Sequence, residues 1–94
     1  MIEITQVEVL PGYRLHLCFN NGIQGTIDLS EWVGKGVFVL WKDERFFERV
    51  RIGSFGELVW DDQIDLCPDA LYLKMTGEEP ENLFPNLQKW MSYA

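Results

Sequence analysis

Three aspartates fall within five residues of the sequence, in the stretch Asp61-Asp62-Gln63-Ile64-Asp65. On a long helix, a DDxxD spacing can hold magnesium and a pyrophosphate. Here the preceding residues are strand-like, and a chain of 94 residues is too short to build a helical prenyl-binding pocket. The EF-hand template for calcium also fails, because Tyr72 stands at its twelfth position where a glutamate is required. We therefore interpret the aspartates as a solvated acidic loop and predict no metal and no cofactor.

The other residues that could do chemistry do not form a complete catalytic set. His16 and Cys18 lie two positions apart on one predicted strand, about 6.6 Å along it, which is too far for a nucleophile and its base. Because the chain has one histidine, a Ser-His triad is nearly excluded. The Gly34-Lys35-Gly36 stretch lacks the spacing and the following Ser or Thr of a phosphate-binding loop. We predict that the protein is not an enzyme.

Cysteine usage and hydropathy place the protein in the cytoplasm. Cys18 and Cys67 are far apart, with neither CxxC spacing nor a histidine cluster, so we interpret them as structural thiols. The N-terminus has no basic segment followed by an apolar one, and no run of about 18 apolar residues occurs. We predict a cytoplasmic protein that does not contact a membrane.

The negative charge of the chain is concentrated in its C-terminal part. Of the formal net charge of −7, residues 1–56 contribute −1 and residues 57–94 contribute −6. Neutralising phosphates requires Lys and Arg on one face, so we predict no direct binding of nucleic acid. A small basic protein is the better electrostatic match. The simpler alternative is that the net charge only keeps the protein in solution.

Two strands near the N-terminus alternate apolar and polar side chains, and their register can be argued. A three-residue loop over 20–22 pairs Leu17 with Gly25 and Leu15 with Ile27, which keeps both apolar sets on one face. It also puts Gly22 at the left-handed position of the loop. Before this hairpin, the apolar phase shifts within residues 2–10, which indicates a bulge near Thr5 or Gln6.

The rest of the chain predicts short helices around a second hairpin. Asp28 and Asp43 are each expected to cap a helix, the first ending at Gly34 and the second near Arg49. Residues 50–54 and 57–60 predict the hairpin, and Pro68 suits the first turn of a further helix. After a linker-like run over 78–81, apolar residues fall on one helical stripe: Leu83, Phe84, Leu87, Trp90 and Met91.

These elements predict a single α+β domain over residues 1–94. We expect a mostly antiparallel sheet of four or five strands, with short helices packed on one face and a C-terminal helix. Residues 74–94 would be an extension that ends in a docking helix, because a helix of about eight residues is marginal in isolation. Whether it docks on its own chain or on another stays open.

The order of the short motifs resembles a known family, the domain-of-unknown-function family 2442 (DUF2442). The matching parts are the hairpin leading into Asp28-Leu29, the GVF of residues 36–38, the GELVW of residues 56–60 and the IDLCPDALY of residues 64–72. The resemblance covers residues 1–73 and implies an α+β fold without established activity or agreed catalytic residues. It also implies a bacterial source. Some members are fused to a helix-turn-helix domain, and others are encoded beside a member of unknown-function family 4160 in arrangements suggestive of toxin–antitoxin pairs.

Our leading functional hypothesis is a small acidic interaction protein, antitoxin-like in binding a small basic protein. The first alternative is a ligand-binding or enzymatic module with a pocket near Trp60, Asp65 and Tyr72, and the second is a homodimer formed through residues 82–94. Trp60 and Trp90 fit either an interface or the core. The predicted interaction surface comprises Trp60, Asp61, Asp62, Asp65, Asp69, Tyr72 and Trp90.

Overall fold

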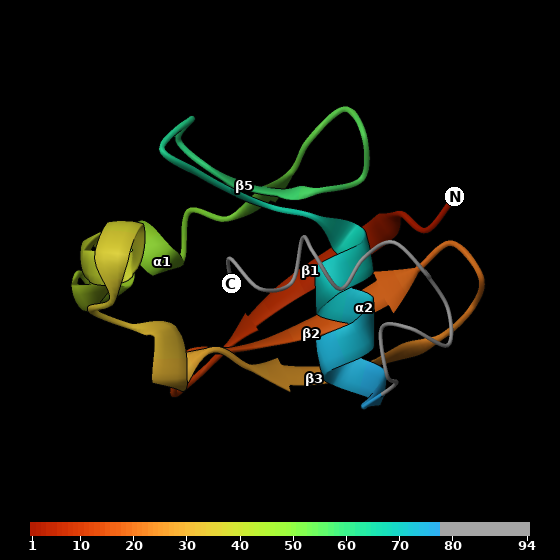
Figure 1. Cartoon of the computed structure of the whole chain (residues 1–94), viewed down its shortest axis with the longest axis horizontal. Coiled ribbons are helices and arrows are strands. Elements are labelled where there is room, and N and C mark those ends of the chain that lie inside the picture. The colour runs from red at the N-terminus through yellow and green to blue at the C-terminus, as the bar shows by residue number, and fades with distance from the viewer. Residues whose placement is uncertain (78–94) are drawn as a thin grey trace.

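The structure, a computed structural model, describes residues 1–77, so the predicted docking helix and Trp90 lie outside the described residues. The fold is α+β, as predicted, with short helices beside antiparallel strands (Figure 1). The described part has six strands, divided between two three-stranded sheets, where the sequence predicted one sheet of four or five. The extra strand is one that the sequence left unassigned because it is only three residues long.

The first sheet is an antiparallel meander of β1 (Ile4–Leu10), β2 (Arg14–Phe19) and β3 (Gln24–Asp28). The predicted register is confirmed, because Leu17 pairs with Gly25 and Leu15 with Ile27. Leu15, Leu17 and Ile27 are buried on the inner face.

Both predicted irregularities of this sheet are also confirmed. Gly22 has a φ of +89°, and the amide of Phe19 donates to the carbonyl of Ile23 at 2.9 Å, so the loop spans three residues. The pairing of β1 with β2 shifts between Ile4 and Gln6, where the bulge was predicted.

Short helices connect the two sheets. They are the 3-10 helices η1 (Ser30–Trp32) and η2 (Gly36–Lys42) and the helix α1 (Glu44–Phe47). Asp43 caps α1 as predicted, since its Oδ1 accepts from the amide of Arg45 at 3.0 Å, but this helix ends earlier than expected. The predicted cap by Asp28 is not formed, because Leu29 is the N-cap residue of η1 and no side chain caps this helix. Asp28 Oδ1 accepts from the amide of Ser30 at 2.8 Å, which forms a local turn before a single 3-10 turn.

The second sheet consists of β4 (Arg51–Ile52), β5 (Leu58–Trp60) and β6 (Ile64–Leu66). β4 and β5 form the predicted hairpin. α2 (Pro68–Thr76) follows, with Pro68 in its first turn as predicted, and Gly77 ends it in the left-handed conformation with a φ of +74°.

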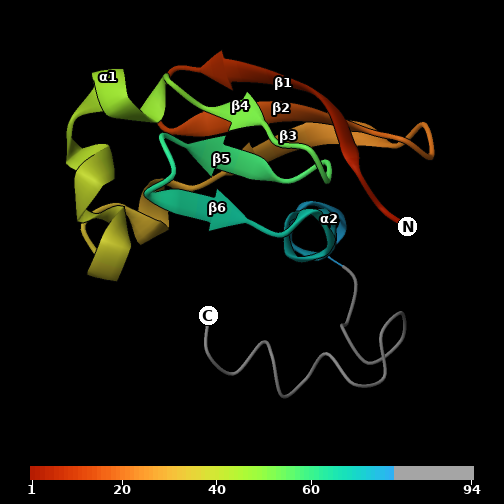
Figure 2. The ribbon, with the colours of Figure 1, turned by 90° about the horizontal axis from the view of Figure 1, so that it is seen from above.

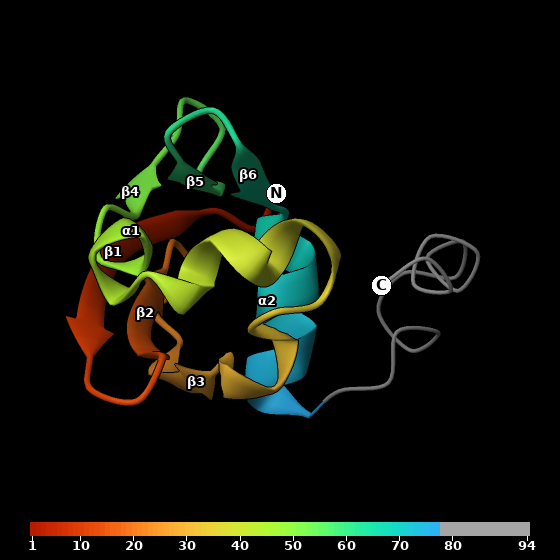
Figure 3. The same ribbon diagram turned by 90° about the vertical axis from the view of Figure 1, so that its left-hand side faces the viewer.

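The two sheets and α2 surround one apolar core. Figure 3 shows the second sheet on the β1 side of the first sheet and α2 across from β2. Seen from above, β4, β5 and β6 lie in front of the first sheet, and α2 follows from the end of β6 (Figure 2). The core side chains of these elements pack together in one cluster. The indole Nε1 of fully buried Trp60 donates to the carbonyl of Phe47 at 2.9 Å, which ties β5 to α1. No helix within residues 1–77 is long and apolar enough to cross a membrane.

Candidate interaction surface

The two adjacent aspartates form the turn between β5 and β6. Asp61 and Asp62 have φ values of +48° and +60°, and the amide of Gln63 donates to the carbonyl of Trp60 at 2.8 Å. Two successive residues at positive φ are typical of a type I′ turn, which lies here within a three-residue connection because Trp60 pairs with Ile64. Asp is one of the few residues that tolerates this conformation, because its short polar side chain can bond locally. Two of the three aspartates of the acidic motif are therefore explained by the backbone conformation of the turn.

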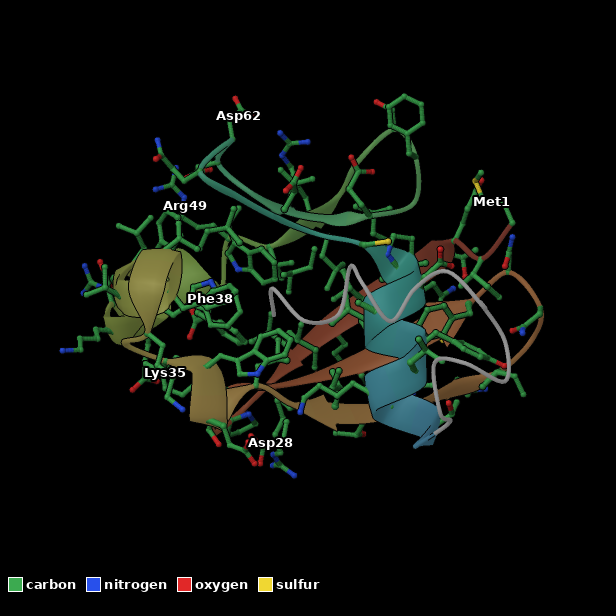
Figure 4. The ribbon with its side chains drawn as sticks, viewed as in Figure 1. Met1, Asp28, Lys35, Phe38, Arg49 and Asp62 are labelled. Atoms are coloured by element: carbon green, nitrogen blue, oxygen red, sulfur yellow. The ribbon has the colours of Figure 1, made fainter. Side chains whose placement is uncertain are left out.

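Each turn aspartate also pairs with an arginine. Asp61 lies 2.9 Å from a guanidinium nitrogen of Arg49, and Asp62 lies 3.6 Å from one of Arg51. The Asp62 side chain is 89% exposed, so its ion pair contributes little to stability. Figure 4 shows Asp62 at the tip of the β5–β6 hairpin with Arg49 near it.

The outer face of the second sheet carries an open, polar hollow of about 340 Å³, which we call the acidic groove. In the sheet, Val59 of β5 stands between Arg51 of β4 and Asp65 of β6, so these three side chains share one face. The groove is lined by Arg51, Gly53, Ser54, Glu57, Val59, Asp62, Gln63, Ile64 and Asp65. Three carboxylates therefore face one guanidinium, and the groove is net negative.

Glu57 is held in place at one end of this groove. Its Oε1 accepts a 2.9 Å hydrogen bond from the amide of Phe55, and its carboxyl group lies over Gly53, where no Cβ interferes. Neither Glu57 nor Arg51 was singled out from the sequence. The alternation of side chains along the second hairpin could have found Arg51, because it places this residue opposite Val59.

The structure separates the other predicted surface residues from the groove. Trp60 pairs with Ile64 and is fully buried, so it faces the core, while Asp65 faces the opposite side of the sheet. Tyr72 packs edge-on against Phe19, with ring centroids 5.1 Å apart. The alternative pocket near Trp60, Asp65 and Tyr72 is therefore not formed by these side chains. Trp90 lies outside the described residues.

Asp69 and Tyr72 belong to a second area at the start of α2. Asp69 lines an open hollow together with Met1, Ile2, Asn20 and Asn21. The side-chain amide of Asn21 donates to the Tyr72 hydroxyl at 3.3 Å, which links α2 to the β2–β3 loop. The predicted surface is thus two areas, one on the second sheet and one on α2.

His16 and Cys18 contact neutral amides on the outer face of the first sheet. Nε2 of His16 lies 3.0 Å from Oε1 of Gln24, and the thiol of Cys18 lies 3.6 Å from Oε1 of Gln6. No carboxylate orients the imidazole in these contacts. Within residues 1–77, no three histidine, cysteine or acidic side chains gather in a way that could hold a metal ion.

These observations define a small α+β domain with a charged, open surface on its second sheet. The chain belongs to the family described as "Protein of unknown function (DUF2442)", whose profile matches residues 4–77. The resemblance seen in the sequence is thereby confirmed. A comparison with curated proteins finds no match.

One solved structure shares the fold. It is the crystal structure of a protein described as "Putative DNA Binding Protein" NE0471 from Nitrosomonas europaea ATCC 19718, with a TM-score of 0.75 at 23% sequence identity. The match covers 98% of this chain, and the chain spans 62% of the length of that protein. At this identity the likeness shows the fold alone.

The structural neighbour corrects one prediction. From the sequence we excluded direct binding of nucleic acid, but a protein of the same fold is described as a "Putative DNA Binding Protein", which contradicts that exclusion. The physical reason is that a net charge sums over the whole surface, whereas phosphate contacts need only a local group of bases. Lys35, Lys42 and Arg45 fall within eleven residues, on or beside η2 and α1.

Proposed function

We propose that this domain is a non-catalytic interaction module that binds a basic segment of another protein through the acidic groove. The observation that supports it is the set of carboxylates from Glu57, Asp62 and Asp65 around the single guanidinium of Arg51. Because Arg51 pairs with Asp62, the carboxylates of Glu57 and Asp65 are left to attract a partner's lysine or arginine.

The shape of the groove favours a protein chain over a small molecule. Pockets for small molecules are usually concave and mostly apolar, with a few polar groups. The acidic groove is open and polar, and Val59 and Ile64 are the aliphatic residues that line it. An antitoxin-like role is the specific form of this proposal that the family resemblance suggests. The charge of the sequence favours a small basic protein as the partner, and its hydropathy favours the cytoplasm as the location.

A titration with a defined basic peptide tests the proposal. A ten-residue peptide of alternating lysine and glycine is added to the isotope-labelled full chain, and backbone amide shifts are followed by NMR. We expect the largest shifts at Glu57, Asp62 and Asp65. The variant Glu57→Gln/Asp65→Asn should weaken binding about tenfold, which corresponds to about 1.4 kcal/mol. Glu31→Gln, which removes an exposed acid outside the groove, should bind as the wild type does.

The salt dependence of this binding provides a second check. Contacts between exposed charges are screened, so raising the ionic strength from about 0.01 M to about 0.5 M should abolish the shifts at the groove. Shifts that survive the salt, or that lie away from the groove, contradict the proposal.

A second candidate function, direct binding of DNA, is favoured by the description of the structural neighbour. Within residues 1–77, Lys35, Lys42 and Arg45 are exposed bases that lie close together in the sequence and are suited to phosphates. Titration with a duplex of about 20 base pairs separates the two functions, because duplex DNA presents a regular row of phosphates. DNA binding predicts shifts at η2 and α1 that Lys42→Glu/Arg45→Glu abolishes, whereas Asp65→Asn leaves them unchanged. Absence of shifts at low salt would reject this second function.

A further inference from the structure

A further hollow, of about 460 Å³, lies between the turn that joins β1 to β2 and the helix α1. We call it the turn hollow. It is lined by Val9, Leu10, Pro11, Gly12, Tyr13, Glu44, Phe47 and Glu48. Figure 1 shows α1 and this turn at the same end of the molecule. The turn hollow shares no lining residue with the acidic groove, so the two are separate places on the surface.

The walls of the turn hollow are mostly aliphatic and aromatic. Val9, Leu10 and Pro11 supply aliphatic side chains from the end of β1 and from the turn. Phe47 supplies an aromatic ring from α1. Pockets for small molecules usually measure about 300 to 1,000 Å³ and combine an apolar lining with a few polar groups. The turn hollow has this size and this kind of lining, whereas the lining of the acidic groove is mostly polar.

Tyr13 is held firmly in this lining. Its carbonyl accepts a 2.9 Å hydrogen bond from the amide of Leu29, and its ring packs edge-on against Phe47 with centroids 5.0 Å apart. Phe47 in turn packs against fully buried Trp41, with centroids 5.1 Å apart. The Tyr13 ring is therefore fixed by the core, and a ligand would not have to order it on binding.

The lining also carries two carboxylates that form no ion pair within residues 1–77. The amide of Glu48 donates to the carbonyl of Glu44 at 3.0 Å, so the two glutamates are one helical turn apart and lie on one face of α1. The ion pairs of the described residues join Asp61 and Asp62 to arginines and involve neither glutamate. No lysine, arginine or histidine lines the turn hollow. Both carboxylates are thus available to a cation.

The phenol of Tyr13 lies within electrostatic reach of this negative charge. Burial, followed by the charges of Glu44 and Asp43, raises the pKa of Tyr13 above its ordinary value of 10.0. The hydroxyl is therefore uncharged at neutral pH, and its oxygen remains an acceptor for an N–H group.

These properties together favour an organic cation as the ligand. An anion would meet two carboxylates and no base, and Ca²⁺ takes more oxygen ligands than this lining offers. A guanidinium or ammonium group on a short alkyl chain matches both parts of the lining. Its N–H groups can donate to Glu44 and Glu48 while its methylene groups contact Val9 and Leu10.

We propose that the turn hollow binds an alkylguanidinium or alkylammonium group, carried either by a free small molecule or by an arginine or lysine side chain of a partner. Glu44 and Glu48 accept hydrogen bonds from the cationic group, and the aliphatic wall contacts the alkyl chain. This site is independent of the acidic groove and of the proposed function, because it lies on other elements and uses other carboxylates.

A titration with n-butylguanidinium tests the proposal. The compound is added to the isotope-labelled full chain, and backbone amide shifts are followed by NMR. We expect saturable shifts at Gly12, Tyr13, Glu44 and Glu48. The neutral isostere n-butylurea, and guanidinium chloride, which lacks the alkyl chain, should each bind at least about tenfold more weakly. Equal binding of n-butylurea, or the absence of saturable shifts at the lining residues, overturns the proposal.

Charge-neutralising variants test the role of the two glutamates. Glu44→Gln/Glu48→Gln should weaken the binding of n-butylguanidinium about tenfold. Both positions are exposed, so the variant should fold as the wild type does. Glu8→Gln/Glu31→Gln removes the same charge from exposed positions outside the turn hollow and should leave the affinity unchanged. Equal losses for the two variants would show a general charge effect and overturn the proposal.

Intermolecular nuclear Overhauser contacts locate the alkyl chain. We expect contacts from the butyl protons to the methyl groups of Val9 and Leu10, and none to those of Val59, which lines the acidic groove. The groove variant Glu57→Gln/Asp65→Asn should bind n-butylguanidinium as the wild type does. Contacts to Val59 in place of Val9 and Leu10, or loss of binding in the groove variant, would assign the cation to the acidic groove and overturn the proposal.

A capped peptide, acetyl-Gly-Arg-Gly-amide, distinguishes the two sources of the cation. If it shifts the same lining residues and binds more tightly than n-butylguanidinium, the turn hollow receives an arginine side chain of a partner. If n-butylguanidinium binds more tightly than the peptide, the ligand is a free small molecule. Binding of neither compound at the turn hollow overturns the proposal.

Discussion

The amide of Ile4 donates a 2.9 Å hydrogen bond to the carbonyl of Gly56, and so joins the first sheet to the turn between β4 and β5. The backbone around Gly56 packs closely against the residue that precedes Ile4. Gly56 has a φ of +77°, and a Cβ at this position would lie 2.8 Å from Cγ and 2.9 Å from Cα of Glu3. The two sheets therefore meet at a point that accepts only glycine.

We predict that Gly56→Ala destabilises the protein severely. It adds a backbone clash with Glu3 to the strain of a positive φ, so we expect a loss of about 3 kcal/mol or more in the free energy of unfolding. Gly22→Ala is the matched control, since its φ is +89° and no atom lies within 4 Å of the position that its new methyl group would take. It should cost only about 1 kcal/mol. Urea unfolding of both variants checks this, and equal losses would contradict the packing argument.

A glycine at position 62, in the turn between β5 and β6, should increase the stability of the protein. Asp62 has a φ of +60°, which is strained for residues with a Cβ, so Asp62→Gly should stabilise the protein by about 0.5 to 1 kcal/mol. This corresponds to a Tm increase of about 2 to 8 °C. Measuring Tm at about 0.5 M salt screens the exposed ion pair with Arg51. Asp65→Asn removes a charge from the adjacent strand without relieving strain, and its Tm should stay nearly unchanged. A Tm that falls for Asp62→Gly would contradict the assignment of strain to this turn.

The two central tryptophans should respond differently to the same substitution. Trp60 donates to the carbonyl of Phe47, whereas the indole Nε1 of Trp41 has no hydrogen-bond partner in the described part of the chain. Both side chains are fully buried, so Trp→Phe removes similar volume at each. We expect Trp60→Phe to cost about 1 to 3 kcal/mol more than Trp41→Phe, because it also leaves a buried carbonyl unpaired. The free energy of unfolding of both variants is measured in denaturant. Equal losses for Trp60→Phe and Trp41→Phe would contradict this role of the hydrogen bond.

The turn at Asp28 should contribute an acid-sensitive part of the stability. Hydrogen bonds from the hydroxyl and the amide of Ser30 lower the pKa of Asp28, and Arg14 and Lys74 lower it further. Because the pKa is lower in the folded state, the stabilisation is present above the unfolded-state value of about 3.9 and is lost as pH falls through the folded-state value. In Ser30→Ala the pKa should rise toward about 3.9, as measured by NMR of the side-chain carboxyl. Ser54→Ala should leave the pKa of Asp28 unchanged.

Local patterns predicted the hairpins well, because their physics is contained in short stretches. The alternation along β2 and β3 permits only the register that pairs Leu17 with Gly25, and Gly22 suits the left-handed loop position. The same patterns left the strand over residues 64–66 unassigned, because it has only three residues and its alternation signal is weak.

Residue patterns alone were enough to establish the α+β class, the family, the three-residue hairpin loop and the start of α2 at Pro68, since each depends on neighbouring residues or on motif order. The packing in three dimensions was needed to establish that Trp60 is buried while Asp65 faces out, and that Arg51, Glu57 and Asp65 share one groove. It was also needed to show that the two sheets meet at Ile4 and Gly56. These relationships join residues distant in the chain, and no local pattern specifies which distant surfaces pack together.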